Sequence, residues 1–174
     1  MTVNRRKILE GTLIREQITL ATNKSKGDAG EQDVIDHVPC PNCGKGLILL
    51  PSQNPLYDVQ CSRCTFRAQI KTKHCRPTST IPGGGWDVIE KVHKSGFMIP
   101  PLMVNFKWKH NGRRKQVILF FPFIPFKKHL KSYCLSDGHP QAGYEMFNYV
   151  KLLDLPFFVL HDPHGEGQKL RVAE

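Results

Sequence analysis

The sequence predicts one mixed α/β domain with a metal site on one edge. Three observations support this: segments with helical and strand-like periodicity follow one another along the chain, four cysteines form two close pairs, and 40% of the residues are hydrophobic. A chain of 174 residues with this apolar content is long enough to bury a core and is not of a disordered type.

The first part of the chain is expected to be helical. Apolar residues recur at helical spacing over 4–20 and a polar stretch follows, so residues 1–27 are predicted to form an N-terminal helix and linker. Asp28 and Glu31 resemble a capping pair at the start of a second, short helix, which Pro39 ends.

Four cysteines give the most specific signal. They are arranged as Cys40-x2-Cys43 and Cys61-x2-Cys64, with 17 residues between the pairs. This spacing is typical of a tetrahedral zinc site, and we expect one structural zinc ion within residues 40–64. The alternatives are two disulfides or four unrelated thiols.

The remaining periodicity predicts strands around the cysteine pairs and a hairpin further on. Asn111-Gly112 is the strongest hairpin signal in the chain, and Gly96 is the expected stop of a helix that begins near Trp86. Residues 28–165 are predicted to form the main domain and 166–174 a polar tail. The expected strands are 46–50, 57–60, 66–71, 102–109, 116–121 and 156–161; 72–85 is expected to be a loop, 126–133 a basic helix and 135–149 irregular.

The charge of the chain indicates a polyanionic partner. Lysine and arginine number 25 against 15 acidic residues, a formal net charge of +10. The longest apolar run, 117–124, is far shorter than the roughly 20 residues that span a bilayer, and the N-terminus lacks the features of a signal peptide. We therefore expect a cytoplasmic protein with no membrane partner.

Chemistry is expected beside the second cysteine pair. Asp58 lies three residues before Cys61, and Gln69 and Lys71 share one face of the strand that follows. An acid, a second oxygen ligand and a lysine in one cleft suit Mg²⁺ or Mn²⁺ and phosphate hydrolysis. In this prediction Asp58, Gln69 and Lys71 are catalytic, with Asp58 and Gln69 holding the ion. The alternative is a turn aspartate and two strand residues that face solvent.

These residues carry a resemblance to a known family. The pattern Asp-x2-Cys-x2-Cys-x4-Glu-x-Lys, preceded by Cys-Pro-Asn-Cys, is that of the DpnI-like, Dam-replacing restriction endonucleases, which belong to the PD-(D/E)xK nucleases. The resemblance spans roughly 28–165 and is specific over 40–71. It implies a mixed sheet flanked by helices, an inserted four-cysteine zinc site and Mg²⁺-dependent cleavage of double-stranded DNA at a specific sequence. Some members require adenine methylation. A type II restriction system further implies a bacterial or archaeal cell and a cognate methyltransferase as partner.

The chain departs from the family pattern in two ways. Gln69 stands where the family has glutamate, which removes one negative charge from the metal site. Either the natural site holds its ion more weakly, or the residue has been substituted and the protein binds DNA without cutting it. The family's C-terminal winged-helix domain has no counterpart in the sequence, so DNA reading is expected from this domain, a second copy or a separate partner. Monomer and homodimer both remain open.

Further residues are predicted around this site. Glu31 is a candidate accessory acid, with a capping glutamate as the alternative. The predicted DNA contacts, each with a solvated or packing role as its alternative, are Arg67, Lys73, His74, Arg76, Trp86, Lys107, Lys109 and Arg113. The competing function is a non-catalytic zinc-ribbon module that binds DNA or RNA and retains a degenerate nuclease site.

Overall fold

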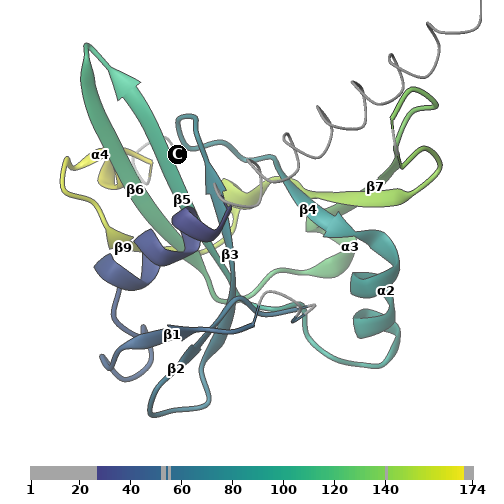
Figure 1. The fold of residues 1–174 in the computed structure, drawn as a ribbon, viewed down its shortest axis with the longest axis horizontal. Helices are drawn as coiled ribbons and strands as arrows, with labels where there is room; N and C mark the ends of the chain where they lie inside the picture. The colour runs from purple at the N-terminus through teal and green to yellow at the C-terminus, as the bar shows by residue number, and fades with distance from the viewer. Residues whose placement is uncertain (1–26, 52–53, 55, 140, 171–174) are drawn as a thin grey trace, which may run out of the picture.

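The computed structural model describes residues 27–51, 54, 56–139 and 141–170. The helix predicted over 4–20 lies outside these residues. In the described part of the chain, a helix at 27–37 is followed by nine strands, by α-helices and by one 3-10 helix. Figure 1 shows their arrangement. Their bounds are β1 Leu47–Leu49, β2 Val59–Cys61, β3 Arg67–Lys73, β4 Ile81–Gly85, α2 Trp86–Lys94, β5 Leu102–His110, β6 Arg113–Phe121, α3 Phe126–His129, β7 Leu130–Cys134, β8 Glu145–Tyr149, η1 Leu152–Asp154, β9 Phe158–His161 and α4 Glu166–Lys169.

Six strands form the main sheet, in the order β1-β2-β3-β5-β6-β9. Within it β3 and β5 run parallel, with Gln69 opposite Leu102 and Lys73 opposite Phe106; the other neighbours are antiparallel. The parallel pair needs a long crossover, which here contains β4 and α2. The expectation of a mixed α+β fold is therefore confirmed.

The main sheet is buried on both faces. Side chains alternate along β5, so Leu102, Val104 and Phe106 join one core while Met103 joins the other. The helix at 27–37 covers the second core through Val34, and Val38 follows it there (Figure 1). Met103 and Asn105 are fully buried because this helix lies over them.

A second sheet packs on the opposite side of the main one. Its three strands are ordered β4-β8-β7, and α2 packs beside them (Figure 1). Glycine permits the close approach of β4 and β8, because a Cβ at Gly83 would overlap the Phe147 ring. The helix α2 ends as predicted near Gly96, whose φ of +80° favours glycine.

Three local predictions were wrong, all in this second sheet. The loop expected over 72–85 contains β4, the basic helix expected over 126–133 is one turn followed by β7, and the irregular segment contains β8. Each strand is short, and β8 pairs with the distant β4 as well as with β7, so tertiary pairing decides the conformation of these strands. Residues 166–170, assigned to the polar tail, include α4, where a Cβ at Gly167 would lie 2.9 Å from Val159.

The β5–β6 hairpin extends beyond the sheet (Figure 1). Its turn forms at Asn111 and Gly112, both with positive φ, as this dipeptide predicts. The pairing of β3 with β5 stops at Phe106, and the pairing of β9 with β6 stops at Ile118. Beyond these limits each hairpin strand pairs only with the other. Among the described residues no helix is long and apolar enough to cross a membrane.

Candidate functional site

Four cysteines meet at the β1 end of the main sheet. The Sγ atoms of Cys40, Cys43, Cys61 and Cys64 all lie within 4.8 Å of one another. The Sγ–Sγ distance is 3.6 Å between Cys40 and Cys64 and 3.4 Å between Cys43 and Cys61. These distances exceed a disulfide bond of about 2.05 Å and approach the roughly 3.8 Å separation in a tetrahedron with Zn–S bonds near 2.3 Å. The predicted cysteine cluster is confirmed, and it is compatible with a zinc site.

Hydrogen-bond donors at the second knuckle lower the pKa values of Cys61 and Cys64, whereas burial raises the pKa of Cys40. The N–H groups of Arg63 and Cys64 donate to Cys61 Sγ at 3.3 and 3.4 Å. Hydrogen bonds from the Asn42 side chain and the Phe66 backbone lower the pKa of Cys64 to about 6. Gly44, with φ of +73°, supplies the left-handed turn of the first knuckle. Metal-binding sulfur is deprotonated, so these donors suit a metal site.

The second knuckle also places the candidate catalytic residues. Cys61 ends β2 and Cys64 lies in the turn into β3, so the cluster ties these two strands together at that turn. Only Val59 and Gln60 of β2 pair with β3, at Ala68 and Arg67. Within the described residues β3 has no strand partner on that edge beyond Ala68, and the edge is open to polar side chains.

Asp58 occupies this open edge of β3. The Gln69 N–H points the other way, to Pro101 O at 2.8 Å, whereas the Ile70 N–H donates to Asp58 Oδ2 at 2.6 Å. The carboxylate therefore satisfies a backbone donor that a neighbouring strand would otherwise accept. Asp58 is held in place by the same strand that carries Gln69 and Lys71.

The charges of three residues interact across this edge. Burial, followed by the negative charges of Asp58 and Asp28, raises the pKa of Glu31 to about 7. Burial also raises the pKa of Asp58, against the opposing effects of the Ile70 N–H and the Lys71 charge. Burial lowers the pKa of Lys71, against the attraction of Asp58 and Glu31. The structure thus brings Glu31, Asp58 and Lys71 together, and perturbed groups of this kind are typical of functional sites.

Gln69, on the same strand as Lys71, is hydrogen-bonded to Tyr149. The Tyr149 hydroxyl donates to Gln69 Oε1 at 2.6 Å, and its ring is fully buried. Burial and the charge of Asp58 raise the pKa of Tyr149 well above its ordinary value, so the hydroxyl remains protonated and can donate. Sequence reasoning missed Tyr149 because it lies 80 residues from Gln69, in a segment with no periodicity.

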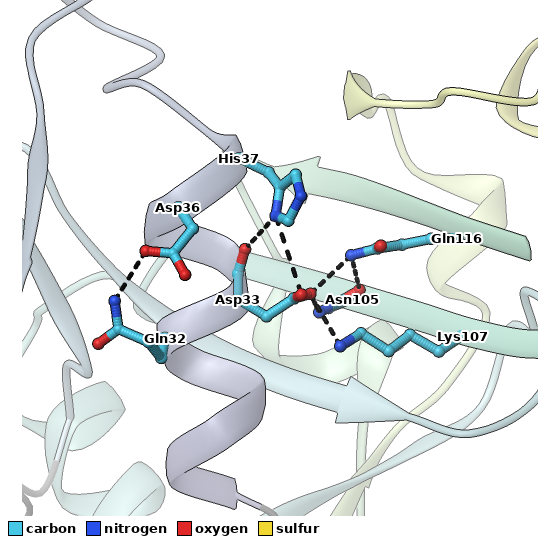
Figure 2. Close-up of polar contacts among 7 residues, drawn as sticks. All are labelled: Gln32, Asp33, Asp36, His37, Asn105, Lys107 and Gln116. Carbon is cyan, nitrogen blue, oxygen red and sulfur yellow. Dashed lines mark hydrogen bonds and ion pairs between the residues drawn. The ribbon is translucent and has the colours of Figure 1, made fainter.

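A polar network joins the helix at 27–37 to the hairpin (Figure 2). Asp33 Oδ2 accepts from Asn105 Nδ2 at 2.7 Å and Gln116 Nε2 at 2.6 Å, and pairs with Lys107 Nζ at 2.9 Å. Burial would raise the pKa of Asp33, but these three donors together lower it. Asn105 is fully buried. It lies on β5, and Gln116 lies on the paired strand β6. Two amide residues on the two strands of a predicted hairpin were the sequence signal for this network.

The predicted DNA contacts have different surroundings. Lys107 is paired with Asp33, and Arg76 Nη2 donates to His110 Nδ1 at 2.7 Å. Trp86 packs against Phe126 and Phe147, with ring centroids 5.1 and 6.5 Å apart, so its ring is committed to the core of the second sheet. The exposed members of the set are Arg67, His74, Arg76, Lys109 and Arg113, while Lys73 is half-buried.

In comparisons with known proteins, no protein-family model matches the chain, and no curated protein matches it.

Proposed function

We propose that the protein is a divalent-metal-dependent endonuclease that hydrolyses phosphodiester bonds of double-stranded DNA, in the manner of a type II restriction enzyme. The observation that carries the proposal is the open edge of β3. There the charges of Glu31, Asp58 and Lys71 interact, and Gln69 of the same strand accepts a hydrogen bond from Tyr149. In this proposal the cell is bacterial or archaeal, the protein is cytoplasmic, and a methyltransferase protects the host site.

The cysteine cluster is proposed to hold one structural zinc ion. A shell of four thiolates fills the tetrahedral coordination sphere and leaves no position for substrate. Its role is to fix β2 against β3, which keeps Asp58 at the strand edge. The free energy of zinc binding would then contribute directly to folding.

The oxygen donors at the β3 edge fit a hard cation such as Mg²⁺ or Mn²⁺. Glu31 and Asp58 offer carboxylates, and Gln69 Oε1 has a second lone pair beside the one that Tyr149 occupies. A bound ion would polarise the phosphate and lower the pKa of a water molecule. Gln69 lends no charge to the site, so two carboxylates would carry the electrostatic part of binding.

The side chains have separable roles in this proposal. Lys71 stabilises negative charge on the phosphate through its ammonium group. Glu31 would act as an accessory acid that helps to hold the ion, whose positive charge favours the carboxylate form. The water oxygen bonds to phosphorus as one P–O ester bond breaks, leaving a phosphate monoester and a hydroxyl. Asp58 is anchored by the Ile70 N–H and need not reorganise.

One observation favours the competing function, a DNA-binding module without catalysis. Gln69 is neutral, and its Oε1 is already hydrogen-bonded to Tyr149, which weakens it as a metal ligand. In that case the basic surface and the zinc cluster would suffice, and no divalent ion would be needed.

The test is a digest of adenine-methylated and unmethylated plasmid with Mg²⁺, with Mn²⁺ and without either. We expect metal-dependent nicking or cleavage, lost by at least about 100-fold in Asp58→Ala and Lys71→Ala while DNA binding persists. Asp36→Ala, on an exposed helix position, is the control. Absence of cleavage with every metal, or cleavage that survives Asp58→Ala, would contradict the proposal.

A further inference from the structure

The projecting hairpin borders a cleft in the described part of the chain. It has a volume of about 610 Å³ and is open to solvent. Residues of both hairpin strands line it, together with Asp33, His74 and His164. Among the lining residues are four cations and a single carboxylate, that of Asp33. The cleft is therefore strongly basic.

Two of these cations are already paired. Lys107 binds Asp33 at 2.9 Å, and Lys115 lies 3.4 Å from Glu166 of α4. Because Asp33 also accepts hydrogen bonds from two amides, its carboxylate is compensated and does not repel an incoming anion (Figure 2). These ion pairs join the hairpin to the helix at 27–37 and to α4.

The other two cations are exposed and face each other. Lys109 and Arg114 are direct cross-strand partners in the hairpin. Like charges at such positions are destabilising unless an anion lies between or across them. Within the described residues neither strand has a second strand partner here. A two-stranded ribbon of this kind is narrow enough to enter the major groove of B-DNA.

The cleft and the candidate active site are built from the same elements of the chain. The helix at 27–37 supplies Glu31 to one and Asp33 to the other, and β3 with its next residue supplies Lys71 and His74. A polyanion bound at the active site would thus be able to continue along the hairpin. The cations lie in succession along the ribbon, Lys107 before Lys109, which suits an extended polyanion better than one compact anion.

We propose that this cleft binds the phosphate backbone of duplex DNA next to the bond that is cut, with Lys109 and Arg114 as the phosphate contacts. The inference rests on the proposed function for its choice of duplex DNA. Lys107 and Lys115 act as anchors of the surface, and Trp108 provides an apolar wall within it.

The experiment compares two double charge reversals that change the net charge equally. Lys109→Glu/Arg114→Glu alters the cleft, and Lys128→Glu/Lys131→Glu alters exposed positions on α3 and β7. Binding of a labelled DNA duplex is titrated without divalent ions between about 50 and 200 mM salt, where each phosphate contact adds about 0.9 to the log–log slope. We expect the slope to fall by about 2 in the cleft variant and to change little in the control. The neutral variant Lys109→Gln/Arg114→Gln should give the same direction.

Equal slopes in the cleft and control variants would overturn the inference, as would a loss of binding confined to duplex RNA. The outcome is independent of cleavage: a protein that cuts no DNA with any metal, yet shows the slope change, would refute the proposed nuclease and retain the binding cleft. Circular dichroism of each variant checks that it is folded.

Discussion

The hydroxyl of Tyr149 donates a hydrogen bond of 2.6 Å to the side-chain carbonyl of Gln69. The two residues come from different sheets, β8 and β3, so this bond joins the second sheet to the candidate active site. A buried hydroxyl needs an acceptor, which fixes the amide with Oε1 towards Tyr149. The bond thus determines how residue 69 is presented to its neighbours.

Gln69→Glu should strengthen divalent-metal binding. A carboxylate at this position holds a hard cation better than an amide does and accepts a stronger hydrogen bond from Tyr149. We expect Mg²⁺ affinity and cleavage to rise by about tenfold or more, measured by calorimetric titration and plasmid digestion; for the natural glutamine, we expect better activity with Mn²⁺. Equal metal affinity and activity in the two proteins would place the metal elsewhere.

Tyr149→Phe should weaken metal binding when it is combined with Gln69→Glu. Loss of a residue that orients a ligand typically costs roughly 10- to 100-fold in affinity, and we expect about tenfold here. Tyr144→Phe is the matched control, because the hydroxyl of Tyr144 is exposed and donates to Asp87 at 3.3 Å. If both changes leave Mn²⁺ affinity untouched, Tyr149 has no positioning role.

Glu31 should make stability depend on pH. Its pKa is about 7 in the folded protein against an ordinary 4.5, so the folded state binds more protons between these values. The free energy of unfolding therefore falls as pH rises from 4.5 to about 7. The free energy of unfolding of Glu31→Gln should exceed that of the wild type by about 1 kcal/mol above pH 7, after allowance for solvent screening. Below pH 4.5 the two values should match. Denaturant unfolding without Mg²⁺ measures this; Glu90→Gln on α2 should show no such pH-dependent gain.

Cys61→Ala should prevent stable folding, because it removes one of four ligands from a closed metal shell. Metal analysis of the wild type should find one zinc per chain, and the variant should aggregate or lose its cooperative unfolding transition. Cys134→Ala, at an exposed cysteine outside the cluster, should behave as the wild type. A folded, zinc-free Cys61→Ala protein would argue against a structural metal.

Asp33→Ala should destabilise the protein by about 2 kcal/mol, because it leaves the donors of Asn105, Gln116 and Lys107 without their shared acceptor. Since the pKa of Asp33 is lowered, its contribution is present above its ordinary 3.8 and is lost as pH falls below that value. Chemical denaturation at neutral and acid pH checks both points. Asp36→Ala, which loses only a bond with Gln32, should cost far less.

Sequence patterns predicted what depends on local signals. The cysteine spacing located the cluster, Asn111-Gly112 located the hairpin, and strand periodicity placed Lys71 on a strand beside the second knuckle. What escaped prediction is non-local. The strands β4, β7 and β8 are short and form only through one another, and Tyr149 reaches Gln69 across 80 positions. The Asp33 network likewise requires a helix and two strands to be in place before its donors meet.

The open-sided hairpin divides the amide protons of one strand into two groups. Those of residues 102–106 lie between β3 and β6, whereas those of residues 107–110 face only one neighbouring strand. In hydrogen–deuterium exchange the tip, residues 107–116, should open as a unit, while the base exchanges through a much larger unfolding event. A single hairpin would thus contain a base that exchanges slowly and a tip that opens locally. A bound ligand would be detected first as slower exchange in the tip.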